Sequence, residues 1–212
     1  MCRLIAVRDA TPFAISAMLR PLATIARRSK EYQGDGWGCA WWNGGVWERH
    51  RSLRPIWEDD LDRFGSTVAL LGHARSAFRN EGIAVENNMP FVEERAAFVF
   101  NGELRGVRIS ASGRIGAEKL FRFLREMGSE TGLESLRHAA SVLRKRSGYV
   151  RAMNFVLASG PVLRAGTWYS EDPEYFTLHL KRDGSRAVLS SEPFPDEPGW
   201  IPVPNGETLE VG

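Results

Sequence analysis

The chain has 212 residues, 43% of them hydrophobic and 25% charged, with a formal net charge of +2 at pH 7. These values are ordinary for a soluble globular protein whose core needs no disulfides or metals, and a charge near zero gives no field that favours nucleic acid. The two cysteines, Cys2 and Cys39, give neither a disulfide framework nor a metal-ligand pattern, and no apolar run reaches the roughly 18 residues of a membrane span. We therefore expect a cytoplasmic protein without cofactor, signal peptide or membrane segment.

The pattern in the first half of the chain predicts five strands, two helices, a glycine-rich loop and one irregular stretch. A buried strand is expected at 2–8, followed by a helix at 15–30 that Pro21 kinks or breaks. A glycine-rich loop at 32–38 precedes a hairpin of strands 39–42 and 46–50, joined by Asn43-Gly44-Gly45. A short helix is expected near 58–64, a central buried strand at 67–73, irregular chain at 74–94 and a buried strand at 96–100.

The second half predicts two helices and then only strands and turns. Apolar residues at helical spacing mark helices at 117–127 and 133–146. Strands are expected at 154–158, 162–169, 175–180 and 186–189, with a short closing strand at 207–211. Hairpins outnumber crossovers, which indicates a single α+β domain over residues 1–212 with antiparallel sheets and helices on the outside.

Cys2 is the first residue that suggests chemistry. Because Cys is small, an aminopeptidase can remove Met1 and leave a chain that begins with a thiol and a free α-amine. Such an amine has a pKa of roughly 8 and can accept the thiol proton, so the residue is a nucleophile with its own base. Position 2 alone more often indicates a buried apolar residue at the start of a strand.

Three further motifs stand where strands meet loops. Gly34-Asp35-Gly36-Trp37-Gly38 lets backbone approach a ligand, or simply forms a turn, and it lacks the Gly-Lys-Ser/Thr of a phosphate loop. Arg75 can grip a carboxylate with two hydrogen bonds, or lie at the surface, and His73 beside it fits a packed structural histidine. Asn101-Gly102 presents an amide and a backbone N–H, as in an oxyanion hole, but also favours a type I′ turn.

In this order the four motifs resemble the class II glutamine amidotransferases, which are N-terminal-nucleophile (Ntn) hydrolases. The sequence looks most like the stand-alone members, including the γ-glutamyl hydrolase of the ergothioneine pathway. Segments 86–91, Glu-Asn-Asn-Met-Pro-Phe, and 191–204 are also similar to family patterns, so the resemblance covers nearly the whole chain.

The resemblance implies a four-layer αββα sandwich and cleavage of a γ-glutamyl amide through a thioester on Cys2. It implies an oxyanion hole of Asn101 and Gly102, and a carboxylate clamp at Arg75. Gly36, Trp37, His73 and Glu103 are the further residues that we expect around the substrate. The expected partners are a small γ-glutamyl substrate and, where ammonia is the product, a separate synthase; no nucleic acid or membrane is expected.

The sequence departs from the family pattern at three positions. Gly116 stands where many members carry an acid that binds the substrate α-amino group, and Met89 and Phe100 replace two histidines. Either a neighbour such as Glu103 substitutes for the acid, or the substrate is not free glutamine. The alternative to an enzyme is a degenerate copy that keeps the sandwich and serves as a binding or regulatory module for a partner enzyme.

Overall fold

The computed structural model describes residues 1–78, 81–128 and 132–212. The strands are β1 (Arg3–Ala14), β2 (Trp37–Asn43), β3 (Val46–Ser52), β4 (Ser66–Ala74), β5 (Phe91–Glu93), β6 (Ala96–Arg105), β7 (Tyr149–Ser159), β8 (Val162–Gly166), β9 (His179–Asp183), β10 (Arg186–Ser190), β11 (Ile201–Pro202) and β12 (Thr208–Val211). The helices are α1 (Ile15–Arg28), α2 (Gly116–Gly128), α3 (Leu133–Lys145) and α4 (Pro173–Phe176), with 3₁₀ turns at Ile56–Glu58 and Val85–Asn87.

The described strands form two antiparallel sheets. The larger sheet has the order β11-β9-β10-β1-β4-β2-β3, and the smaller has the order β12-β8-β7-β6-β5. In the larger sheet β1 and β4 are neighbours, with Arg3 opposite Ala74 and Leu4 opposite His73. This register brings the N-terminus of the chain to the end of β4.

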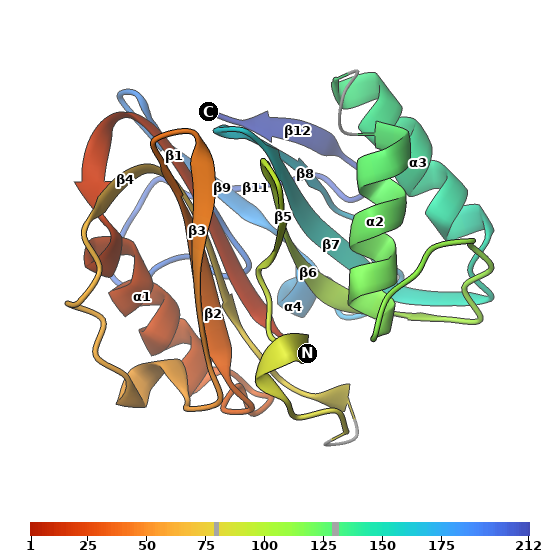
Figure 1. Ribbon diagram of the computed structural model, residues 1–212, viewed down its shortest axis with the longest axis horizontal. Coiled ribbons are helices and arrows are strands. Elements are labelled where there is room, and N and C mark those ends of the chain that lie inside the picture. The colour runs from red at the N-terminus through yellow and green to blue at the C-terminus, as the bar shows by residue number, and fades with distance from the viewer. Residues whose placement is uncertain (79–80, 129–131) are drawn as a thin grey trace.

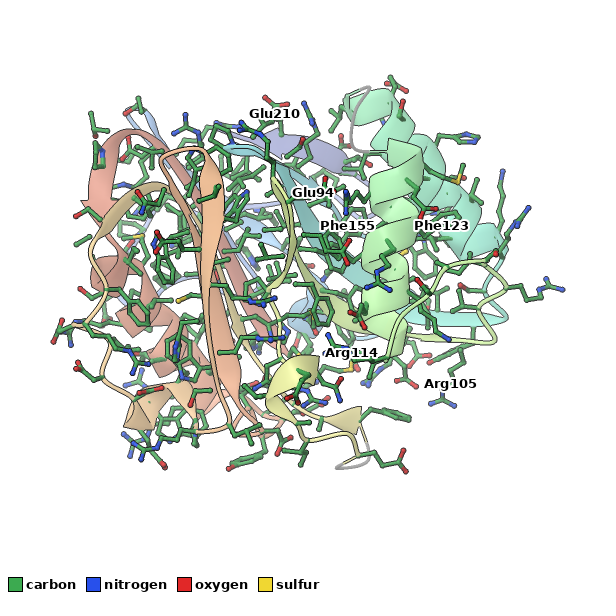
Figure 2. All side chains as sticks on the ribbon, in the orientation of Figure 1. Glu94, Arg105, Arg114, Phe123, Phe155 and Glu210 are labelled. Atoms are coloured by element: carbon green, nitrogen blue, oxygen red, sulfur yellow. The ribbon has the colours of Figure 1, made fainter. Side chains whose placement is uncertain are left out.

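The two sheets lie face to face between helical layers (Figure 1). Helix α1 packs its apolar side, which includes Leu19 and Leu22, on the outer face of the larger sheet. Helices α2 and α3 cover the smaller sheet, where Phe98 of β6 stacks on Phe121 of α2 with ring centroids 5.4 Å apart. Side chains fill the spaces between layers, among them Phe123 of α2 and Phe155 of β7 (Figure 2). The predicted αββα sandwich of antiparallel sheets is confirmed.

Strand β4 lies inside the larger sheet between β1 and β2, and its residues 69–74 are buried on both faces. Its expected range, 67–73, matches Ser66–Ala74 closely. A side chain at Gly72 would place a Cβ 2.9 Å from Ile5 and 3.0 Å from Leu22, so glycine permits the close packing of β1 and α1 on this strand. The hairpin turn is also confirmed, with Gly44 and Gly45 at φ values of 57° and 108°.

Two predicted elements are wrong. Residues 58–64 form no α-helix, because the carboxylates of Asp59 and Asp60 accept hydrogen bonds from the backbone N–H groups of Asp60 and Asp62, both at 3.0 Å, in place of helical bonding. The expected strand at 175–180 begins instead as the helical turn α4, which Pro173 opens at its first position, and only its last residues join β9.

Other elements differ in extent. Helix α1 continues through Pro21 without a break and ends at Arg28. Strand β6 does not stop at Phe100; it runs through Asn101-Gly102 to Arg105, so these two residues lie inside a strand and not in a type I′ turn. Of the expected irregular stretch 74–94, residues 79–80 lie outside the described residues. In the rest, Ala74 ends β4, residue 78 is in a 3₁₀ conformation, and the 3₁₀ turn Val85–Asn87 and β5 follow. None of the described helices is long and apolar enough to cross a membrane.

Candidate active site

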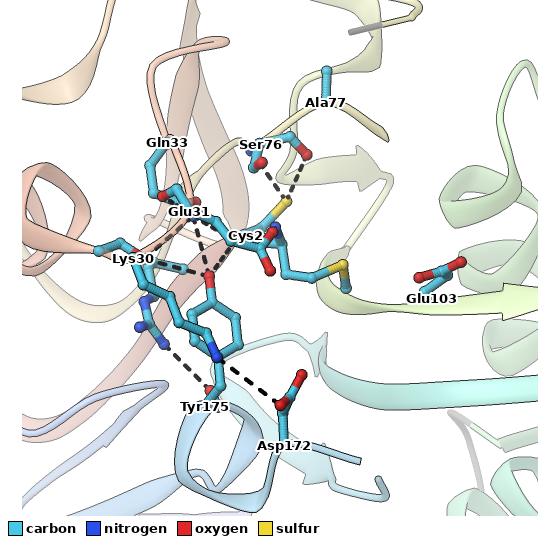
Figure 3. A network of polar contacts seen from close by, with 12 residues as sticks. Cys2, Lys30, Glu31, Gln33, Ser76, Ala77, Glu103, Asp172 and Tyr175 are labelled. Carbon is cyan, nitrogen blue, oxygen red and sulfur yellow. Dashed lines mark hydrogen bonds and ion pairs between the residues drawn. The ribbon is translucent and has the colours of Figure 1, made fainter. Parts of the chain in front are cut away.

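Cys2 lies immediately before β1, at the end of β4, and is half-buried. Its Sγ accepts a hydrogen bond from the Ser76 backbone N–H at 3.4 Å and lies 3.6 Å from the Ser76 carbonyl oxygen (Figure 3). Burial raises the pKa of the Cys2 thiol, while the N-terminal ammonium, the Ser76 hydrogen bond and Arg75 act in the opposite direction. The thiol therefore needs a nearby base to become a thiolate at neutral pH.

Arg75 follows β4 directly and is buried, with 8% of its surface exposed. Its Nη1 donates to Asn88 Oδ1 at 3.2 Å and its Nη2 donates to the Gly82 carbonyl at 2.9 Å. Burial lowers the pKa of Arg75, and the negative charges of Cys2 and Asp35 oppose this. The guanidinium is thus fixed by the 82–88 segment at a point where it interacts electrostatically with the Cys2 sulfur.

The glycine-rich loop supports this arginine. Gly36 accepts a hydrogen bond from the Arg75 backbone N–H at 2.8 Å and has a φ of +110°, and a Cβ there would lie 2.2 Å from Asn88 Nδ2. The Asp35 carboxylate accepts from the Ala77 N–H at 2.7 Å. Trp37 is different: its indole is fully buried in the core beneath α1 and donates to Asp59 at 2.9 Å. The structure does not bring the Trp37 side chain to Cys2.

His73 joins the two sheets. Its ring is fully buried, and Nε2 lies 3.2 Å from the carbonyl oxygen of Phe100 on β6. Burial, aided by the charge of Arg75, lowers the pKa of His73 to about 3, so the imidazole is neutral at physiological pH. This is the behaviour of a packed structural histidine that holds β4 against β6.

Asn101 is fully buried, and neither its Oδ1 nor its Nδ2 has a hydrogen-bond partner in the described part of the chain. Buried polar side chains are normally paired, so an amide in this state marks a place where a partner is expected to bind. Gly102 follows in β6 opposite Met153, and a Cβ at this position would lie 2.1 Å from the Ala152 carbonyl oxygen. Only glycine fits there without displacing β7.

The strand registers place Cys2 and Asn101 on facing surfaces. On β6, Phe98 points to α2, so Asn101, three residues later, points to the larger sheet. On the larger sheet, Leu4 pairs with His73, whose ring reaches β6, so that face looks back at the smaller sheet. Cys2 precedes Leu4 by two residues and lies on the same face. Glu103, two residues after Asn101, shares the Asn101 face; it pairs with Arg105 and lies 4.0 Å from Arg151.

Three residues that the sequence analysis did not single out hold Met1, which precedes Cys2. The Met1 ammonium pairs with Glu31, and its carbonyl oxygen accepts hydrogen bonds from Gln33 Nε2 and from the Tyr175 hydroxyl, the latter at 2.7 Å (Figure 3). These residues come from the segment after α1 and from α4. Nothing in the local sequence connects position 175 with position 1, so only the fold reveals the contact.

The chain is similar in sequence to γ-glutamyl hydrolases and in structure to a glutamine aminotransferase class-II domain protein. γ-Glutamyl-hercynylcysteine sulfoxide hydrolase from Mycobacterium tuberculosis is 28% identical over 201 residues, which are 91% of this chain and 82% of the relative. The protein of the same name from Mycolicibacterium smegmatis is 26% identical over 227 residues, covering 100% and 96%. No protein-family model matches the chain. Among solved structures, the glutamine aminotransferase class-II domain protein from Silicibacter pomeroyi superimposes with a TM-score of 0.69 at 19% identity, covering 100% of this chain and 95% of that one.

The chain has the class II glutamine amidotransferase fold. The resemblance predicted from the four ordered motifs is therefore confirmed, both for this fold and for the stand-alone γ-glutamyl hydrolases. Within the amidotransferase fold, Gly116 is the exposed first residue of α2, and no atom lies within 4 Å of the Cβ position. The nearby Glu118 is held by Arg114 and Arg122. Among the described residues, no group of three or more His, Cys, Asp or Glu side chains is arranged to hold a metal ion.

Proposed function

We propose that this protein is a hydrolase of γ-glutamyl amides, in which Cys2 becomes the N-terminal residue once Met1 is removed. The relatives that it matches over 82% and 96% of their length are named as γ-glutamyl hydrolases, which supports this reaction class. The observation that carries the proposal is the buried Asn101 amide, which lacks a partner among the described residues on the surface facing the Cys2 thiol. The proposed unit is a single domain over residues 1–212.

In the proposed reaction, the α-amine of Cys2 takes the thiol proton and the thiolate attacks the γ-carbonyl carbon. Asn101 Nδ2 and the Gly102 N–H donate hydrogen bonds to the oxyanion. Removing one such donor typically raises the activation barrier by about 3 to 4 kcal/mol. The ammonium of Cys2 returns its proton to the leaving nitrogen, which departs as ammonia or an amine. Water then hydrolyses the γ-glutamyl thioester and releases glutamate and the free thiol.

The substrate is expected to be held by the α-carboxylate and the α-ammonium of its γ-glutamyl group. Arg75 offers a guanidinium that can pair with the α-carboxylate, with Gly36 supporting the Arg75 backbone. His73 keeps β4 and β6 in place. Glu103 is the carboxylate that we propose for the α-ammonium, because it lies two residues beyond Asn101 on the same face of β6. This assignment replaces the acid that Gly116 does not provide.

The leaving group is proposed to be an amine larger than ammonia, since the matched relatives act on a γ-glutamyl conjugate. Where ammonia is the product, a separate synthase would receive it. A free thiol nucleophile fits a reducing cytoplasm, which is the compartment that we propose.

The test is a screen of γ-glutamyl amides for glutamate release by protein whose loss of Met1 has been verified by mass spectrometry. We expect turnover by the wild type and by Cys39→Ala, whose thiol is buried under α1, and none by Cys2→Ala. Equal turnover by Cys2→Ala, or by protein that retains Met1, would overturn the mechanism. Binding of γ-glutamyl ligands without turnover would instead favour the non-catalytic module.

A further inference from the structure

The carbonyl oxygen of Met1 occupies a buried polar pocket. Gln33 is fully buried and Tyr175 is 4% exposed, and both donate to this oxygen. The two side chains also contact each other, with Gln33 Nε2 3.3 Å from the Tyr175 hydroxyl, which lies 3.3 Å from Ser29 Oγ. The pocket is therefore rigid before any change occurs at the N-terminus.

The same pocket holds an acceptor without a donor. Gln33 Oε1 is buried and has no hydrogen-bond partner within residues 1–78, 81–128 and 132–212. A buried acceptor in this state is costly, so its retention indicates that a donor reaches it in another state of the protein. Glu31 adds a carboxylate at the same place, where it pairs with the Met1 ammonium.

Removal of Met1 places a new group at this pocket. The Met1 oxygen and the Cys2 nitrogen are bonded to one carbon, with bonds of roughly 1.23 and 1.33 Å, so they lie only about 2.3 Å apart. After cleavage the pocket loses that oxygen, and the Cys2 nitrogen becomes an amine beside it. An ammonium has three N–H donors. The Tyr175 hydroxyl oxygen and the Glu31 carboxylate already lie around Met1, and Gln33 Oε1 becomes the third acceptor when the side-chain amide turns over, since Nε2 is the atom that now faces the Met1 oxygen.

We propose that Gln33, Tyr175 and Glu31 receive the α-amine of Cys2 after Met1 is removed and are positioning residues for proton transfer from the thiol to that amine. The proton leaves Sγ and binds the α-nitrogen, which gives a thiolate and an ammonium, and no other reactant is needed. Acceptors around the nitrogen stabilise the ammonium and so favour the thiolate. This inference rests on the proposed function, since it concerns the same nucleophile.

Charged and titratable groups from several elements surround the Cys2 thiol and this pocket. On the side of the nitrogen are Glu31, Tyr175, and the cations Arg3 and Lys30, which lie over the Tyr175 ring at 4.1 and 4.8 Å. On the side of the sulfur are Arg75, Asp35 and the neutral His73. Glu103 and Asp172 lie further out in the same region (Figure 3), and Arg151 pairs with Asp172 and lies 4.0 Å from Glu103. Arg75 favours the thiolate, while Glu31 favours the ammonium.

The test measures the rate at which iodoacetamide alkylates Cys2 as a function of pH, in Met1-processed protein with the Cys39→Ala background. Tyr175→Phe and Gln33→Leu each remove one acceptor of the ammonium, and Glu31→Gln removes the negative charge that faces it. We expect the rate at pH 7 to fall about tenfold or more in each variant, because hydrogen bonds to a charged group are strong. The midpoint of the pH–rate curve should move to higher pH. In these variants the α-ammonium of Cys2 loses its proton before the thiol does, so the thiol ionises without a positive charge beside it.

The matched control is Tyr169→Phe. Tyr169 belongs to the same small apolar cluster as Tyr175, but its hydroxyl bonds to Thr177 Oγ1 at 3.0 Å. The alkylation rate of Cys2 in Tyr169→Phe should therefore stay within about twofold of the parent. Tyr175→Phe retains the ring under Arg3 and Lys30, so it tests the inference even if Gln33→Leu does not fold. An unchanged rate and midpoint in folded Tyr175→Phe and Glu31→Gln would overturn the inference.

Alkylation needs no γ-glutamyl substrate, so the two proposals fail separately. If processed wild type hydrolyses no γ-glutamyl amide but the alkylation shifts occur, the proposed function fails and the amine pocket stands. If hydrolysis occurs and the variants alkylate like the parent, the amine pocket fails and the function stands. In an active enzyme, the three variants should lower kcat with little change in KM, because they face the nucleophile and not the substrate.

Discussion

Asn101 and Asn154 lie directly opposite each other on β6 and β7, and both are fully buried. The Asn154 amide is paired at both ends: it donates to the Phe176 carbonyl at 2.6 Å and accepts from the Thr167 hydroxyl at 2.7 Å. The Asn101 amide has no partner in the described structure. Two identical residues on neighbouring strands therefore differ in their bonding, since the fold uses both ends of the Asn154 amide and neither end of the Asn101 amide.

Asn101→Leu should separate stability from activity. Replacing an unpaired buried amide with an apolar group of similar shape removes its desolvation penalty, so the free energy of unfolding should stay equal or rise by about 1 kcal/mol. Loss of the oxyanion donor should lower kcat by about 10²- to 10³-fold. Urea denaturation and steady-state kinetics measure the two effects. The matched variant Asn154→Leu should instead lose about 1 to 3 kcal/mol of stability; equal losses in both variants would contradict this contrast.

The stability of the fold should depend on pH through His73. The pKa of this residue is lowered to about 3, whereas in the unfolded chain it is near 6.5, so the unfolded state binds the extra proton. The contribution is fully present above pH 6.5 and is lost as the pH falls toward 3, by up to about 1.4 kcal/mol per pH unit.

Urea denaturation between pH 7 and 4 measures this slope. His73→Gln keeps a donor for the Phe100 carbonyl but does not titrate, so its slope should be shallower than that of the wild type. His138→Gln changes an exposed histidine on α3 and should leave the slope unchanged. A wild-type slope in His73→Gln would show that other groups cause the acid sensitivity.

Gly36→Ala should destabilise the loop that holds Arg75. A Cβ at Gly36 would lie 2.2 Å from Asn88 Nδ2 and 2.6 Å from the Ser52 carbonyl oxygen. Gly45→Ala is the matched control, because its φ of +108° nearly equals the +110° of Gly36 while the nearest atom to its Cβ lies at 3.8 Å. Both variants carry the strain of a positive φ, and Gly36→Ala should lose about 1 to 3 kcal/mol more from steric contact, as measured by thermal unfolding. Equal losses would mean that the loop adapts.

Arg75→Lys should weaken substrate binding through the α-carboxylate. A lysine cannot reproduce the two-pronged contact of a guanidinium, so KM should rise about tenfold or more with a smaller change in kcat. The control is a substrate that lacks the α-carboxylate, a γ-aminobutyryl amide, which the wild type should already bind weakly. If Arg75→Lys weakens the binding of both substrates equally, Arg75 acts on the structure of the 82–88 segment and not on the substrate carboxylate.

The sequence predicted most of the fold because its signals are local. The apolar run of β4, the Asn43-Gly44-Gly45 turn and the helical spacing of α2 and α3 each identify an element without reference to the rest of the chain. The two errors, at 58–64 and 175–180, arose where aspartates or a proline changed the local backbone bonding.

The candidate site was predictable only in part. Cys2, Arg75 and Asn101 stand out as motifs, and the strand registers then place them around one region. Trp37 stood in the same motif as Gly36, but strand alternation turns its indole into the core beneath α1. Gln33, Glu31 and Tyr175 carry no motif at all, because their contact with Met1 depends on the position of α4 against β1 in the folded chain.

The most direct test of the central claim is covalent labelling of Cys2 by a glutamine-mimicking electrophile, 6-diazo-5-oxo-norleucine, followed by peptide mapping in the mass spectrometer. We expect one label per Met1-processed chain, located on Cys2, with loss of γ-glutamyl hydrolysis in proportion to labelling and protection by a γ-glutamyl substrate. Asn101→Leu should label far more slowly than Asn154→Leu. Absence of a label on Cys2 in processed, folded protein, or labelling without loss of activity, would contradict the account.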